Sequence, residues 1–228
     1  MRKLISRLME HARLKNTQAC LVLVGNDLEM LSQYLQEKQY EQQHTIFQII
    51  ADDTMNTLPA ISNRVGVQQL HLNLNNTHLV NTFFTHLSKL GYRIDLCIFQ
   101  TTWQTDQSTI SPIQQLQYDW QKYALTTITV AQATIRQMLF KSRGTLVFLA
   151  GGQCVRPEDD FVQQSIQSSI QAMAQSLARE FQPKGIHVVY CALTKWSATD
   201  AVFMQEVSRV CWHLHQQPNS TWSQELRI

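Results

Sequence analysis

Glycine is scarce in this sequence. There are seven glycines in 228 residues, about 3%, whereas average proteins contain about 7%. Loops that bind the phosphates of a dinucleotide depend on closely spaced glycines, so this scarcity disfavours such a loop. Charged residues are also few, at 16%, and the formal net charge is only +2. We therefore do not expect a protein that binds nucleic acid or a membrane through a large electrostatic field.

The cysteines follow no pairing pattern. The chain contains no Cys-x-x-Cys motif, and several cysteines fall within apolar runs, where cysteine behaves as a small hydrophobic residue. The five are Cys20, Cys97, Cys154, Cys191 and Cys211. Their odd number and the lack of a secretory leader predict a reducing, cytoplasmic location. No apolar run reaches the roughly 18–20 residues of a membrane span, so no membrane span is expected.

Motifs for metal binding or nucleophilic catalysis are missing as well. His213 and His215 are two residues apart in a predicted helix, so their side chains point away from each other. They cannot share a tetrahedral ion, and we expect no metal site. The chain also has no Gly-x-Ser-x-Gly elbow and no P-loop.

What the sequence does contain is a regular alternation of strand and helix patterns. Short apolar runs alternate with segments whose apolar residues recur at spacings of three and four. The expected strands are 18–25, 45–51, 69–74, 94–99, 145–150, 186–192 and 225–228, and the expected helices are 28–40, 79–90, 113–139, 161–181 and 200–216. This order predicts a doubly wound, Rossmann-like α/β domain over 18–228, with a parallel sheet of about six or seven strands.

The first 17 residues form a separate, basic arm. Apolar residues line one side of a helical pattern, and five basic residues are opposed only by Glu10. The pattern predicts an amphipathic helix. It can pack on its own domain, dock onto a protein partner, or contact a membrane surface or nucleic acid.

Short motifs along the chain resemble those of short-chain dehydrogenases/reductases. Leu177-Ala178-Arg179-Glu180 and Gly185-Ile186-His187-Val188 match the end of that family's catalytic helix and its next strand, and Gly144-Thr145-Leu146-Val147 matches its fifth strand. Their order and spacing extend the resemblance over nearly the whole chain, from about Gln18 to Ile228. The resemblance implies a Rossmann-like fold and an origin among NAD(P)-dependent oxidoreductases.

The catalytic positions of that family carry other residues here. The resemblance places Gly151 at the serine, Gln163 and Gln167 at the Tyr-x-x-x-Lys pair, and Tyr123 or Ala124 near the asparagine of the proton relay. Hydride transfer needs a hydroxyl that donates or accepts a proton, with a lysine lowering its pKa. Glutamine does not titrate and glycine has no hydroxyl, so we expect no catalytic residues at these positions.

The phosphate-binding loop is altered in the same way. Of the family's three glycines only Gly25 is present, because Glu29 and Leu31 stand at the other two positions. Asp27 and Glu29 also bring negative charge to the start of a helix, which would repel a pyrophosphate. We therefore expect no cofactor.

Three residues keep the possibility of residual nucleotide binding open. The resemblance places Gly25 in the phosphate loop, Asp52 where relatives hold the adenosine ribose, and Asn73 beside the adenine. Carboxylates and amides also cap strand ends in any α/β fold, which is the structural alternative. The fourth strand ends Phe99-Gln100-Thr101-Thr102 instead of Asn-Asn-Ala-Gly.

These observations predict a pseudoenzyme that serves as a structural or protein-binding subunit. Members of the family associate through the helices that correspond to 113–139 and 161–181, so a homo-oligomer or a heteromer is expected there. The second helix carries a polar stripe that is either solvent-exposed or part of an interface: Gln164, Gln167, Gln171 and Gln175. The alternatives are an atypical NAD(P)-dependent oxidoreductase and a non-catalytic nucleotide or small-ligand sensor.

Overall fold

The structure of the protein is a computed structural model. It describes residues 17–38, 44–62, 64–101, 112–151, 157–194 and 196–228, apart from the side chains of 112, 115 and 157–162. The predicted basic arm, except Thr17, and Cys154 lie outside the described residues. Among those residues, no helix is both long and apolar enough to cross a bilayer.

Seven parallel strands form one sheet in the order β3-β2-β1-β4-β5-β6-β7. Their bounds are Gln18–Val24 (β1), Thr45–Ala51 (β2), Gly66–Leu72 (β3), Tyr92–Gln100 (β4), Gly144–Gly151 (β5), Ile186–Leu193 (β6) and Glu225–Arg227 (β7). The order reverses at β1, which pairs with β2 on one side and with β4 on the other. This is the doubly wound arrangement predicted from the sequence, and the fold prediction is confirmed.

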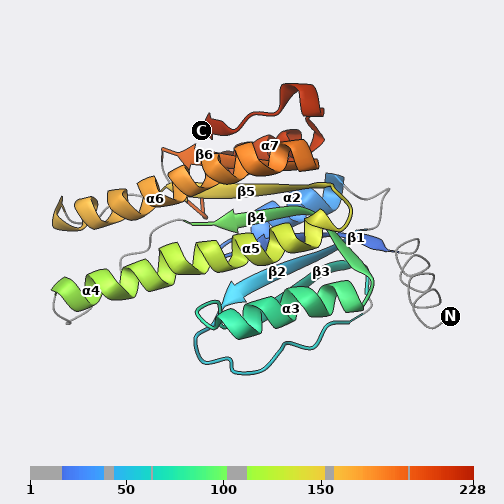
Figure 1. Ribbon diagram of the computed structural model, residues 1–228, viewed down its shortest axis with the longest axis horizontal. Coiled ribbons are helices and arrows are strands. Elements are labelled where there is room, and N and C mark those ends of the chain that lie inside the picture. The colour runs from blue at the N-terminus through green and yellow to red at the C-terminus, as the bar shows by residue number, and fades with distance from the viewer. Residues whose placement is uncertain (1–16, 39–43, 63, 102–111, 152–156, 195) are drawn as a thin grey trace.

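Helices cover both faces of the sheet (Figure 1). One face packs against α3 (Thr77–Lys89), α5 (Thr126–Leu139) and α6 (Pro157–Phe181), and the other packs against α2 (Glu29–Lys38) and α7 (Ala201–Gln216). Strand β1 shows why helices must pack on both faces of the sheet. Cys20, Val22 and Val24 point to the first face while Leu21 and Leu23 point to the second, and all five are fully buried.

The described cysteines belong to this core. Cys20, Cys97, Cys191 and Cys211 are buried, and all four are free thiols. Burial raises the pKa of Cys97 and of Cys191 to about 12, so both are protonated at neutral pH. They pack as small hydrophobic residues, as the sequence predicts.

The largest differences from the predicted element boundaries concern three elements. β3 begins at Gly66 rather than at 69 and ends at Leu72, because it pairs with the full length of β2. The helix predicted over 113–139 is interrupted: α4 (Pro112–Asp119) continues into a π-helical stretch, η1 (Trp120–Leu125), before α5 begins. The helix expected from 161 already begins at Pro157, a residue type that suits the first turn of a helix.

Candidate functional site

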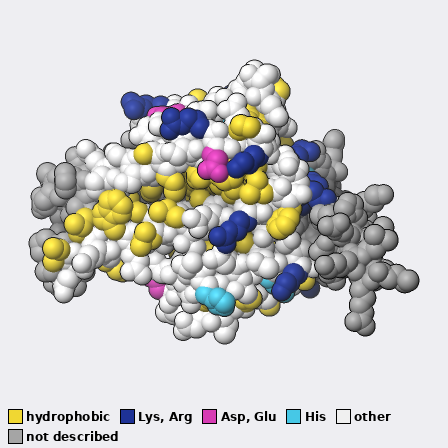
Figure 2. Space-filling view, in the orientation of Figure 1, with side chains coloured by type: hydrophobic (Ala, Val, Ile, Leu, Met, Phe, Trp, Pro, Cys, Tyr) yellow, Lys and Arg dark blue, Asp and Glu magenta, His cyan; other side chains and the backbone are white. Residues whose placement is uncertain are grey.

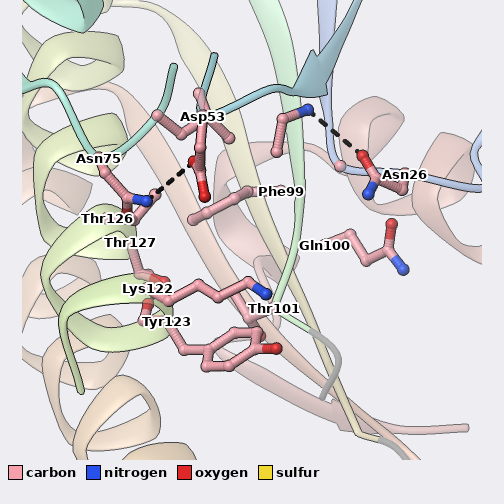
Figure 3. A pocket seen from close by; sticks show the side chains of 13 residues that line it. Asn26, Asp53, Asn75, Phe99, Gln100, Thr101, Lys122, Tyr123, Thr126 and Thr127 are labelled. Atoms are coloured by element: carbon pink, nitrogen blue, oxygen red, sulfur yellow. Dashed lines mark hydrogen bonds between the residues drawn. The ribbon is translucent and has the colours of Figure 1, made fainter. Parts of the chain in front are cut away.

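A pocket of about 200 Å³ lies at the carboxyl-terminal edge of the sheet, beside the point where the strand order reverses (Figure 3). Ligands of open α/β sheets bind at this position. The lining comes from the ends of β1, β2 and β4, from the segment after β3, and from η1 and α5: Gly25, Asn26, Ala51, Asp53, Leu74, Asn75, Phe99, Gln100, Thr101, Lys122, Tyr123, Thr126 and Thr127.

The side chain of Gln100 covers the first glycine of the loop. Gly25 has a φ of +142°, and a Cβ placed on it would lie 2.5 Å from Oε1 and 2.6 Å from Cβ of Gln100. Only glycine fits there, because its backbone conformation and the close approach both exclude a side chain. Gln100 thus occupies the space directly above the glycine that the resemblance assigns to a phosphate loop.

The turn from β1 into α2 carries acidic side chains at the start of the helix. Asp27 adopts a left-handed conformation with a φ of 58°, and α2 begins at Glu29. Glu29 accepts a hydrogen bond from Nε2 of Gln48 at 3.2 Å, and Leu31 is fully buried among the side chains on the α2 face of the sheet. The positions of the two later family glycines therefore carry a carboxylate and a core residue.

One wall of the pocket is held together by a chain of polar side chains. Asn75 donates from Nδ2 to Asp53 Oδ1 at 2.9 Å, and Thr126 donates its hydroxyl to Asn75 Oδ1 at 3.1 Å (Figure 3). Asn26 accepts at Oδ1 from the backbone N–H of Ala51 at 3.3 Å. These contacts join the loops after β1, β2 and β3 to the start of α5.

Asp52 and Asn73 have local structural partners. Asp52 accepts hydrogen bonds from the backbone N–H and the hydroxyl of Thr54, at 3.0 and 2.6 Å, and these bonds hold the pKa of its carboxyl below the usual value. Asn73 donates to the backbone oxygen of Asp53 at 3.0 Å. Neither lies among the described residues that line the pocket, whereas Gly25 does.

The opposite wall comes from the π-helical stretch. Lys122 and Tyr123 extend side by side from η1 into the pocket (Figure 3). The Lys122 ammonium lies 5.3 Å from the ring centroid of Tyr118 and 5.6 Å from that of Tyr123. The hydroxyl of Thr127 donates a hydrogen bond to the backbone oxygen of Tyr123.

Gly151, Gln163 and Gln167 are not among the described residues that line this pocket. Gly151 ends β5 with a φ of +149°, and a Cβ on it would collide with the backbone oxygen of Leu193. Gln163 is buried, and Gln167 is half-buried. Nε2 of Gln167 is itself buried, and no described residue accepts a hydrogen bond from it.

Among the described lining residues, the ionisable groups are Asp53, Lys122 and Tyr123. Sequence reasoning placed Tyr123 near the family's proton relay but missed Lys122 and Asp53. Among the described residues no group of three histidine, cysteine or acidic side chains is arranged to hold a metal ion. The pocket offers polar contacts and charges of both signs.

Comparison by sequence finds no relative: no family profile matches the chain, and no curated protein matches it. Comparison by structure finds many matches, and the three described below are 11–19% identical to this chain.

A short-chain dehydrogenase from Rhodopseudomonas palustris has a TM-score of 0.66 and 19% identity, over 92% of this chain and 97% of that one. An oxidoreductase of the short-chain dehydrogenase/reductase family from Brucella ovis, solved with a partially ordered NAD, has a TM-score of 0.67 and 12% identity, over 92% of this chain and 100% of that one. A metagenomic short-chain oxidoreductase solved with NADP has a TM-score of 0.68 and 11% identity, over 93% and 98%. This chain therefore has the Rossmann-like fold of the short-chain dehydrogenases/reductases.

Proposed function

We propose that the protein is a pseudoenzyme with the short-chain dehydrogenase fold, serving as a structural or protein-binding subunit without hydride transfer. One observation carries the proposal: Gln100 packs on Gly25, where a dinucleotide would need open backbone. The pocket that remains, about 200 Å³, is smaller than the roughly 300–1,000 Å³ typical of small-molecule sites. Gly151, Gln163 and Gln167 supply no hydroxyl or ammonium for proton transfer.

Titration with NAD⁺, NADH, NADP⁺ and NADPH tests the absence of a cofactor. We expect no change in melting temperature with any of the four. A ligand present at 100 times its dissociation constant would stabilise the protein by about 2.7 kcal/mol, which is readily measured. A clear shift with a nicotinamide nucleotide would instead favour the atypical oxidoreductase.

A small-ligand sensor is the second candidate, and the pocket's own polar groups favour it. Asp53 and Lys122 place opposite charges in one pocket of a size that excludes a dinucleotide. Stabilisation by a small polar compound, lost in Asp53→Asn, with no response to nicotinamide nucleotides, would support that function.

The assembly role is supported by apolar side chains exposed along α4, η1 and α5. Figure 2 shows hydrophobic side chains gathered over these helices. Six of the ten exposed large hydrophobic residues among those described lie there or at the end of α5: Ile113, Tyr118, Leu125, Ile128, Leu139 and Phe140. Their exposed fractions reach 70% for Phe140, and they are 68% for Ile113 and 54% for Leu125. A concentration of this kind marks a protein-binding surface.

Two glutamines of the polar stripe on α6 have partners within the chain. Gln171 and Gln175 donate from Nε2 to the two carboxylate oxygens of Glu225 in β7, at 2.8 and 3.0 Å. These two glutamines therefore anchor the last strand. Gln164 is exposed and remains available to a partner.

Leu125→Asp tests this surface. We expect the wild-type protein to be an oligomer, and the variant to dissociate at least 30-fold more readily, because a buried interface hot spot contributes about 2 kcal/mol or more. Sedimentation velocity over a concentration series measures the change.

Val202→Asp is the matched control, since Val202 is 74% exposed on α7, outside this surface. It should leave the oligomer intact. A wild-type protein that is strictly monomeric and captures no partner would contradict the assembly role, and so would equal dissociation of the two variants.

A further inference from the structure

A second cavity, of about 810 Å³, lies at the opposite, amino-terminal edge of the sheet. The turn from α5 into β5 forms one side, the start of β6 the floor, and the end of α7 with the segment after it the other side. Its lining is Lys141, Ser142, Arg143, Gly144, Thr145, Gly185, Trp212, His215, Gln216, Gln217, Asn219 and Trp222. The volume falls within the range of small-molecule sites.

The charge of this lining is positive. Lys141 and Arg143 are its only permanently charged side chains, and no carboxylate is among the described lining residues. The ends of α5 and α7 also face this edge, and each helix terminus contributes roughly −0.5 of a charge. The guanidinium of Arg143 can bind an anion, and no described lining residue supplies a competing carboxylate.

The side of the cavity formed by the segment after α7 is fixed in place. Trp222 donates from Nε1 to the backbone oxygen of Gln217 at 2.9 Å, and its ring stacks on His187 with centroids 4.7 Å apart and the planes within 1°. Gln217 accepts at Oε1 from the backbone N–H of Ser223 at 3.1 Å. A wall held in this way loses little entropy when a ligand binds.

The floor and the opposite side are equally constrained. Gly185 has a φ of +78°, and a Cβ on it would collide with the backbone oxygen of Ser142, so β6 begins directly beneath the turn that carries Arg143. Trp212 and His215 are half-buried, with ring centroids 5.5 Å apart. The lining thus contains an arginine from the turn before β5 and two tryptophans from α7 and the segment after it, together with Gln216 and Asn219.

We propose that this cavity binds a small aromatic anion, a planar ring bearing a phosphate or a carboxylate. The ring would pack against the tryptophans, and the anionic group would accept hydrogen bonds from Arg143, whose planar guanidinium matches both groups. The site is separate from the switch-point pocket, so its occupation does not depend on the proposed lack of a cofactor.

Calorimetric titration with phenyl phosphate tests the site. We expect a dissociation constant of about 1 mM or tighter, and binding at least tenfold weaker for inorganic phosphate and for phenol, which each supply half of the ligand. Arg143→Gln should weaken phenyl phosphate at least tenfold, because a hydrogen bond to a charged group is lost. Arg143→Lys should weaken it less, and Arg64→Gln, an exposed arginine beside β3, should leave it unchanged.

Three outcomes would overturn the proposal. The first is no heat of binding at about ten times the expected dissociation constant. The second is equal binding of inorganic phosphate, which would show that the rings contribute nothing. The third is equal loss of affinity in Arg143→Gln and Arg64→Gln, which would show attraction by net charge alone.

Discussion

Restoring a serine at Gly151 is expected to destabilise the protein and to give no dehydrogenase activity. The backbone there has a φ of +149°, and a new Cβ would lie within 3.0 Å of the Leu193 backbone oxygen, closer than side chains are observed to approach. Backbone strain costs about 1–3 kcal/mol and overpacking about 1–3 kcal/mol. We expect Gly151→Ser to lower the free energy of unfolding by about 2–6 kcal/mol, measured by urea denaturation.

Gly91→Ser separates the two contributions. Gly91 also has a positive φ, of +87°, but a Cβ placed on it meets nothing within 4 Å. Its replacement should therefore cost about 1–2 kcal/mol of backbone strain alone. If the free energy of unfolding falls equally in both variants, the contact with Leu193 adds no cost at Gly151. If Gly151→Ser is fully stable, the serine position of the family is open, and the catalytic argument loses that support.

The alternation of apolar patterns was enough to predict the layers of this fold. Strands such as β1 are buried on both faces and read as continuous apolar runs, so their position follows from composition alone. β3 is different, since only Leu70 and Leu72 are buried there and its first residues are half-exposed. Its start is set by pairing with β2, which is not a local property of the sequence.

The π-helical stretch could not be predicted from the sequence, and neither could the pocket lining that depends on it. Nothing in the residues Trp120–Leu125 distinguishes π from α geometry. The wider turn is supported by Thr126 and Thr127, whose hydroxyls bond to the backbone oxygens of Gln121 and Tyr123. That geometry brings Lys122 and Tyr123 into the pocket.

The residues that follow β2 show the same limit of sequence-based prediction on a smaller scale. Asp52 and Asp53 are adjacent, and the resemblance placed Asp52 at the position where relatives hold the ribose. The chain turns there, with Thr54 bonded back to Asp52, so that Asp53 lines the pocket instead. Gly25 directly follows a well-defined strand and lines the pocket.

Acidification below pH 6.5 is the second change expected to have a large effect. Burial is the largest cause that lowers the pKa of His215, to about 4, and burial also lowers the pKa values of His187 and His44. The carbonyl oxygens of Leu214 and Ser223, 3.1 and 2.8 Å from the ring nitrogens of His187, oppose that shift without reversing it. All three histidines therefore favour the neutral form in the folded state.

The direction of the effect follows from proton binding. Between pH 6.5 and about 4 the unfolded chain takes up protons that folded His215 does not, so acid stabilises the unfolded state. The contribution of His215 is fully present above pH 6.5 and is lost as the pH falls to about 4, a change of about 3 kcal/mol at 1.36 kcal/mol per pKa unit. Urea denaturation at a series of pH values measures this loss.

His215→Asn should flatten the pH dependence by about that amount, because asparagine does not titrate and keeps an amide near Thr145, which now lies 3.1 Å from Nδ1 of His215. His78→Gln, at an exposed position on α3, should leave the slope unchanged. A slope that persists in His215→Asn would assign the acid sensitivity to His187, to His44 or to the carboxylates. A slope of opposite sign, with greater stability in acid, would mean that folded His187 is protonated between its two carbonyl oxygens and that those contacts outweigh burial.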